Sequence, residues 1–442
     1  MIYNLHTLIY NLHILIYNLH TLIHNLDTLF CFTQKLTHLN LHGCSRLSGK
    51  CLDEVLPELS SLKSLNLSHC PSCSDRLLIE FGKRSVNIQE LLVESCNGVT
   101  DAGIKAIISS NKQSSDQIGC LDIRHLNVSS SSVSTKSLWL ILLGLPKLRK
   151  LSFSNIQSGL DENCLTLSDN LLELENLNIS YTYISSSNIK WLYERCPRLA
   201  EVTMNCSFEL QGSILQHLTC LTRLTSLNLE GACSELHFEH VAKFLVQRGN
   251  QLTSLNASGI AGVQISVLCL YCQALKDLVL ADCQNLDASI PTWSALTEKQ
   301  RKHIGKSEEF GDLYFSDFCK LQHLNLNHTT FSIHSTEIEQ QLLFKLLASH
   351  ETLQKLLLKG VIGVDDEVLQ NFLESSSNAK LCTLNLSGCE NITIASVYKV
   401  LESCNNLRLL DLSHCWHVGQ SDVSTINVQM KKSGNPLEII WV

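Results

Sequence analysis

The chain repeats one nine-residue string, L-x-x-L-x-L-x-x-C, along its 442 residues. Six copies keep the cysteine at the ninth position, namely Cys44, Cys70, Cys96, Cys283, Cys389 and Cys415. Weaker copies start at Ile118, Leu148, Leu174, Leu199, Leu224, Leu252, Leu321 and Leu353, and a partial copy starts at Leu437. Many tandem copies of one such string predict an array of repeats in which each unit packs against its neighbours.

Each repeat combines two hydrophobic periods. The L-x-L core has period two, so its leucines face one side of a short strand. An amphipathic helix is expected to follow, as in Gly98–Asn111, where Thr100 or Asp101 can cap and isoleucines form the stripe. The segment Ser187–Leu199 repeats this scheme, and Pro197 is expected to end its helix.

One strand and one helix cannot bury their own apolar faces, whereas stacked copies bury a continuous core. The sequence therefore predicts an α/β leucine-rich-repeat solenoid, with a concave parallel sheet and convex helices. We expect about 14 repeats plus a partial C-terminal one, spanning residues 36–442. The copies at Leu275 and Leu321 are 46 residues apart, which predicts an insertion near residues 287–318.

The repeat resembles the cysteine-containing leucine-rich repeats of the F-box/LRR ubiquitin-ligase receptors. The closest match is LLVESCNGVTDAGIKAI, and the C-P-x-L element of that family matches Cys196–Leu199. The resemblance covers about residues 36–442. It implies a non-catalytic receptor that binds a protein substrate on its concave face, as the substrate-recognition subunit of an SCF-type cullin ubiquitin ligase.

The F-box that would bind the Skp-type adaptor and cullin is not found before Leu36. Residues 1–35 instead form heptads, with leucine rows starting at Leu5 and Leu8. This segment is open to three interpretations: translated tandem-repeat DNA, a helical cap, or a coiled-coil or membrane-surface segment. The F-box is either outside this sequence, or the protein is an F-box-free scaffold or inhibitor in cell-cycle or signalling control.

Composition limits the possible partners and compartments. The net charge is -8 with a pI near 6.1, and basic residues do not form long runs, so we expect no nucleic-acid partner. No window of 18 uninterrupted apolar residues occurs, so no membrane span is expected. The chain lacks a secretory signal pattern, and its 20 cysteines are therefore expected to be reduced in the cytoplasm or nucleus.

The cysteines could be taken for a catalytic or metal site, but the repeat explains them. The ninth position also accepts Thr, Ser, Ala, Ile, Leu and Val, and a nucleophile or zinc ligand would not tolerate that exchange. We expect the six ninth-position cysteines to form a buried structural ladder. The C-x-x-C pairs at Cys70–Cys73 and Cys269–Cys272 lack a second pair, so neither a metal, a cofactor nor catalysis is expected.

Binding is expected on the concave face, at repeat positions three, five and seven. Position five holds Asn or Asp in nine copies, at Asn40, Asn66, Asp122, Asn178, Asn228, Asn256, Asn325, Asn385 and Asp411. A solvated polar surface explains such a row. Apolar and charged exceptions are better candidates for partner contacts. With Asp411, the candidate residues are Glu90, Leu92, Glu94, Glu201, Glu230, Val279, Lys355, Leu357, Lys359 and Leu409.

Overall fold

A computed structural model describes most of the chain after residue 35. The described residues are 36–56, 59–84, 88–109, 122–156, 170–205, 212–231, 236–289, 294, 296–304, 315, 320–331, 336–347, 352–375, 380–433 and 437–442. The N-terminal heptads and most of the predicted insertion lie outside these residues. None of the described helices is both long and apolar enough to cross a membrane.

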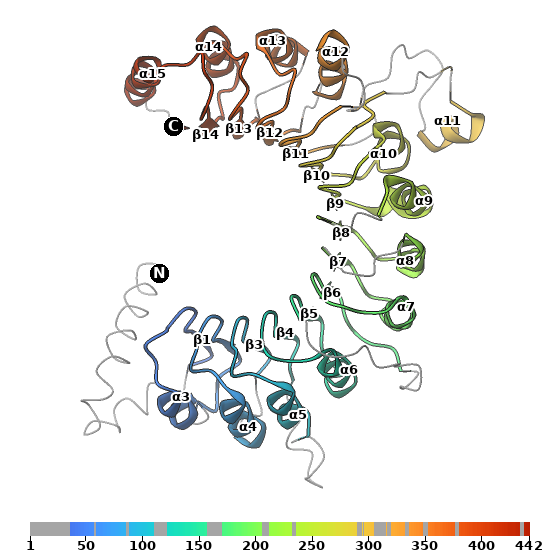
Figure 1. Ribbon diagram of the computed structural model, residues 1–442, viewed down its shortest axis with the longest axis vertical. Helices are drawn as coiled ribbons and strands as arrows, with labels where there is room; N and C mark the ends of the chain where they lie inside the picture. Colours follow the sequence, from blue (N-terminus) through green and yellow to red (C-terminus); the bar gives the residue numbers. More distant parts are fainter. Residues whose placement is uncertain are drawn as a thin grey trace. The chain divides into compact units, whose positions relative to one another are not determined.

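Fifteen three-residue strands follow one another in chain order as a parallel sheet (Figure 1). They are β1 His38–Asn40, β2 Ser64–Asn66, β3 Glu90–Leu92, β4 His125–Asn127, β5 Lys150–Ser152, β6 Asn176–Asn178, β7 Glu201–Thr203, β8 Ser226–Asn228, β9 Ser254–Asn256, β10 Asp277–Val279, β11 His323–Asn325, β12 Lys355–Leu357, β13 Thr383–Asn385, β14 Leu409–Asp411 and β15 Glu438–Ile440. A right-handed crossover connection is the ordinary way to join such parallel strands.

Helices form the connections between strands. They are α3 Gly49–Val55, α4 Asp75–Arg84, α5 Asp101–Ser109, α6 Thr135–Gly144, α7 Ser186–Arg195, α8 Ser213–His217, α9 Phe238–Arg248, α10 Ile265–Tyr271, α11 Glu298–Ile304, α12 Thr336–Leu347, α13 Asp366–Ser375, α14 Ile394–Ser403 and α15 Gln420–Ser433. The predicted leucine-rich-repeat solenoid is thus confirmed. Of the insertion expected near residues 287–318, the structure describes α11 and a few residues beside it.

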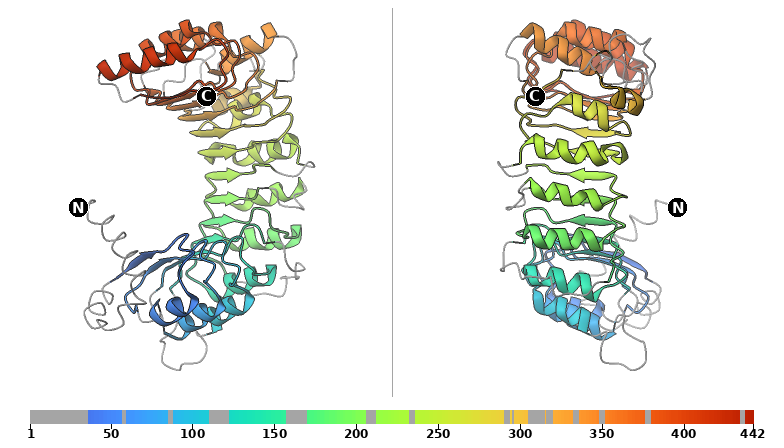
Figure 2. Two further views of the ribbon diagram at one scale, coloured as in Figure 1. Left: turned by 60° about the vertical axis from the view of Figure 1, so that its left-hand side comes forward. Right: turned by 90° about the vertical axis from the view of Figure 1, so that its right-hand side faces the viewer.

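The chain forms two compact units, with the boundary in α7. Unit 1 comprises Met1–Trp191 and Arg195–Pro197, and unit 2 comprises Leu192–Glu194 and Arg198–Val442. Within each unit the helices stack on one side of the strands, as Figures 1 and 2 show. The other side of the strands carries none of the described helices, and we call it the open sheet face.

The core of each unit lies between strands and helices. In unit 1, the register places Leu65 beside Leu39 and Leu91, and the same row continues through the later strands. In unit 2, Leu278, Leu324 and their neighbours form the equivalent row, and these side chains are almost fully buried. Burying one leucine side chain contributes roughly 1.5–3 kcal/mol, so the repeated row accounts for much of the stability.

The polar residue at position five turns the chain out of its strand. In nine repeats, the side-chain oxygen at this position accepts a hydrogen bond from the backbone N–H two residues later, at 2.9–3.0 Å. For example, Asn385 Oδ1 accepts from Ser387 N–H. Asn and Asp suit this local turn because their short side chains reach their own backbone. Their recurrence therefore has a structural cause.

Carboxylates at helix starts join neighbouring repeats. Asp75 Oδ1 accepts from the backbone N–H of Thr100 at 2.7 Å, and Asp75 Oδ2 accepts from its hydroxyl at 2.6 Å. Asp366 makes the same pair of bonds to Thr393, at 2.8 and 2.6 Å. Asp101 likewise accepts from Ser134. Each carboxylate thus satisfies a free N–H near the start of the next helix.

Two predicted copies are misplaced along the sequence. The fourth repeat does not start at Ile118, because β4 pairs Leu126 with Leu91, which makes Ile123 its first position. Asn127, rather than Asp122, therefore occupies position five. The last copy is shifted by one residue, since Ile439 pairs with Leu410. In both cases the pairing with the preceding strand sets the register, which the leucine spacing alone left ambiguous.

Candidate partner-binding surface

The open sheet face consists of side chains at positions three, five and seven. Side chains alternate along a strand, so these three positions point away from the buried leucines at positions four and six. The middle residue of each strand from β1 to β14 is buried, while its two neighbours are half-buried or exposed. All eleven candidate residues occupy these outward positions, three of them in unit 1 and eight in unit 2.

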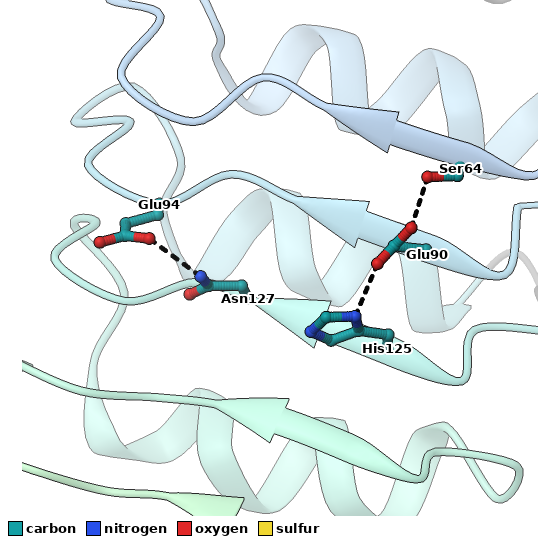
Figure 3. Close-up of polar contacts among 5 residues, drawn as sticks. All are labelled: Ser64, Glu90, Glu94, His125 and Asn127. Atoms are coloured by element: carbon teal, nitrogen blue, oxygen red, sulfur yellow. Dashed lines mark hydrogen bonds and ion pairs between the residues drawn. The ribbon is translucent and has the colours of Figure 1, made fainter. Parts of the chain in front are cut away.

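In unit 1, Glu90 is the centre of a polar chain across three strands (Figure 3). Ser64 Oγ on β2 donates to Glu90 Oε2 at 2.5 Å, and His125 Nδ1 on β4 lies 2.7 Å from Glu90 Oε1. An ionised carboxylate only accepts hydrogen bonds, so Nδ1 carries the proton in this arrangement. These two contacts therefore hold the Glu90 side chain in one orientation on the open sheet face.

The hydrogen bond from Ser64 and the nearby imidazole of His125 lower the pKa of Glu90, against the opposing effect of partial burial. Glu94 is held in a similar way, since Asn127 Nδ2 donates to Glu94 Oε2 at 3.1 Å (Figure 3). Leu92, which lies between these two glutamates in the sequence, is half-buried. The two carboxylates are thus fixed acceptors on either side of an apolar side chain.

The sequence interpretation did not find His125 or Asn127. The misplaced fourth repeat put Asp122 at position five, whereas Asp122 forms an ion pair with Arg124 at 3.0 Å just before β4. The string IRHLNV, from Ile123 to Val128, fits the repeat and would have identified both residues. Their contact with the glutamates depends on strand pairing across 33 to 35 residues of sequence.

In unit 2, the acidic candidates lie apart from the apolar ones. Glu201 and Glu230 are exposed, and Glu230 accepts from Asn256 Nδ2 at 3.3 Å. Val279 is half-buried on β10. Beside it in the sequence, Asp277 on β10 bonds to His323 on β11, another imidazole–carboxylate contact on the open sheet face. Both residues occupy position three of consecutive copies, but their contact depends on the pairing of β10 with β11, which the repeat pattern alone does not show.

Basic and apolar candidates come together around β12. Lys355 and Lys359 are exposed, and Leu357 between them is half-buried. Two strands further along, Leu409 is half-buried at position three. Asp411 accepts from Asn385 Nδ2 at 2.9 Å and from the backbone N–H of Ser413 at 3.0 Å. Its carboxylate is therefore engaged in hydrogen bonds between and within the repeats.

The ninth-position cysteines lie on the other side of the strands. Five of the six are buried, and Cys44 in the first repeat is half-buried. The buried thiols donate to the position-six carbonyl of the preceding repeat, as from Cys415 Sγ to Leu386 O at 3.2 Å. The same bond is made by Cys70, Cys96, Cys283 and Cys389, and by the hydroxyls of Thr182 and Thr329.

This arrangement does not favour thiol chemistry. Burial raises the pKa of Cys415 to about 11 and that of Cys389 to about 12, so both thiols are protonated at neutral pH. Cys415 faces the core, while Asp411 faces the open side. Within the described ranges, no group of three or more His, Cys, Asp or Glu side chains is arranged to hold a metal ion.

Comparisons with known proteins support the fold. No known protein-family profile matches the sequence. The crystal structure of the Rad7 and Elc1 complex in yeast contains a chain that is similar to this one, with a TM-score of 0.51 and 17% sequence identity. The alignment covers 89% of this chain and 83% of that chain. Together with the repeat and the strand order, this likeness defines the chain as a leucine-rich-repeat protein.

Proposed function

We propose that this chain is a non-catalytic receptor that binds another protein on its open sheet face. The main support is the composition of that face. Apolar and charged side chains point outward there and are not packed in the core. Leu92 and Leu357 are apolar positions among polar ones, which is the composition of a protein-binding surface. The thiols, by contrast, are used in hydrogen bonds between repeats.

A cross-linking experiment tests the binding face. A photo-reactive amino acid would replace Leu357 on the open sheet face, or Val246 on α9 as the control. Both side chains are apolar, and Val246 is 52% exposed on the helical side. We expect partner proteins to be captured from position 357 and not from position 246. Equal capture from both positions would refute binding through the open sheet face.

We further propose that the receptor recognises substrates for an SCF-type cullin ubiquitin ligase in the cytoplasm or nucleus. The support is the repeat type and the similar fold of a chain that was crystallised in a complex with Elc1. The alternative is an F-box-free scaffold or inhibitor in cell-cycle or signalling control. Co-purification of the product of the full-length transcript with a Skp-type adaptor would support the first role. Its absence, with other partners retained, would favour the second.

A further inference from the structure

We propose that Lys355, Leu357 and Lys359 bind an extended acidic segment of the partner protein. We call these three residues the β12 line. The inference deepens the proposed receptor function, and it rests on that function, by naming the chemistry of the segment that is bound. It follows from the spacing of the three side chains and from the absence of a carboxylate partner for the two ammonium groups among the described residues.

The β12 line presents three side chains in a row on the open sheet face. Lys355 and Leu357 lie on β12 and point the same way, and the exposed Lys359 follows at position seven, in the turn after the strand. Backbone hydrogen bonds to both neighbouring repeats hold the turn after β12, from Leu358 N–H to Asn385 O at 2.9 Å and from His328 N–H to Lys359 O at 2.7 Å. The row therefore has a rigid base on both sides.

The two ammonium groups have no counter-charge within the described parts of the chain. Neither Lys355 nor Lys359 has a carboxylate oxygen within 4.0 Å among the described residues. The carboxylates on nearby strands are already engaged, Asp277 with His323 and Asp411 with Asn385. An acidic partner would supply the missing charges.

The equivalent row on β3 carries the opposite charge, and its charged groups are bonded to other residues of the chain. Glu90, Leu92 and Glu94 occupy the same three positions in unit 1. Their carboxylates are bonded to residues of the neighbouring strands, such as His125 and Asn127. The β3 row is therefore satisfied within the chain, whereas no described carboxylate occupies the charged groups of the β12 line.

The spacing of the β12 line selects an extended peptide. Side chains on one face of a strand are roughly 6.8 Å apart, so the two lysines, which are four residues apart, start at most roughly 13 Å apart. That separation suits two acidic groups on different residues of the ligand. A peptide strand with acidic residues at i and i+4 and an apolar residue at i+2 has the same spacing. The amide nitrogen of Asn325, beside Leu357, donates to no described residue and can meet a peptide carbonyl.

The test measures the binding of a fluorescent peptide to the full chain by anisotropy. The probe peptide has Asp at i and i+4 and Leu at i+2, and the control peptide has the same composition with the two Asp residues adjacent. We expect the spaced peptide to bind more tightly. Lys355→Glu with Lys359→Glu should weaken its binding by about tenfold or more, because two attractions become repulsions. Lys150→Glu at position three of β5 is the matched control and should leave binding unchanged.

Several results would overturn this inference. They are unchanged binding to the double variant, equal binding of the two peptides, and equally strong competition by single-stranded DNA, which would indicate general attraction to polyanions. If cross-linking at position 357 captures a partner but the spaced peptide does not bind, the receptor function stands and the acidic-segment inference fails. If both experiments fail, the receptor function fails with it. Circular dichroism of each variant would show that the solenoid is intact.

Discussion

Replacing Asp366 by Asn should destabilise the repeats around α13 and α14. The Asp366 carboxylate accepts two hydrogen bonds from Thr393, at the residue that precedes α14. The change keeps the size of the side chain but removes its charge and one of its acceptor oxygens. The first turn of α14 would then lose part of the cap that the neighbouring repeat provides.

The expected loss is about 1–2 kcal/mol in the free energy of unfolding. Hydrogen bonds to a charged group contribute about 1.5–3 kcal/mol each, which gives about 3–6 kcal/mol for two as an upper limit. Asn keeps one oxygen that can still accept from Thr393, and the site is partly open to water, which screens the charge. Both effects reduce the loss to the expected value.

The loss should depend on pH. Partial burial acts to raise the pKa of Asp366, but hydrogen bonds from Ser396 and Thr393 and the charge of Lys399 together lower it. Because the folded-state pKa is below the unfolded value of about 3.9, the ionised group stabilises the fold above that value. This contribution disappears as the pH falls through the folded-state pKa. The difference between wild type and variant should therefore be larger at pH 7 than at pH 3.5.

Urea unfolding followed by far-UV circular dichroism measures this effect. A loss of about 1–2 kcal/mol should lower the midpoint by about 0.5 M, given slopes of a few kcal/mol per molar. Glu367→Gln is the control, because Glu367 is exposed in the same first turn of α13 and meets the same helix dipole. Equal shifts for the two variants, or a larger effect at pH 3.5, would refute the role of the bonds to Thr393.

Substitutions at three further positions test other parts of the fold by the same unfolding measurement. Cys283→Ala should cost about 0.5–1.5 kcal/mol by removing the bond to Ala257 O, and Cys283→Thr should cost less, since Thr329 makes the equivalent bond. Asn385→Ala should cost about 1 kcal/mol by removing the turn acceptor, and Asn385→Asp should also destabilise, because it keeps that acceptor but removes the N–H donated to Asp411 Oδ2 and places two carboxylates together. Leu278→Ala should cost about 2–5 kcal/mol, because Leu278 is fully buried; a smaller loss would contradict the proposed packing.

The sequence was sufficient to predict the repeat and, outside the fourth and last copies, the strands and the direction of their side chains. The reason is local, since alternation along a strand places Leu410 and Leu412 on one face and Asp411 on the other whatever the neighbouring repeats are. The structure accordingly places Cys415 in the core, on the side opposite to Asp411. The pattern of position five was visible, but its cause, the hydrogen bond from the backbone N–H two residues later, was not.

Only the tertiary structure decided which residues meet across repeats. The register of β4 and β15 depends on hydrogen bonds to the preceding strand, and a leucine-rich string can be aligned with its neighbour in more than one way. The same pairing brings His125 to Glu90 and leaves Lys355 without a carboxylate among the described residues. Lateral contacts of this kind join residues some 25 to 35 positions apart, and they decide which charged groups on the open sheet face are used within the fold.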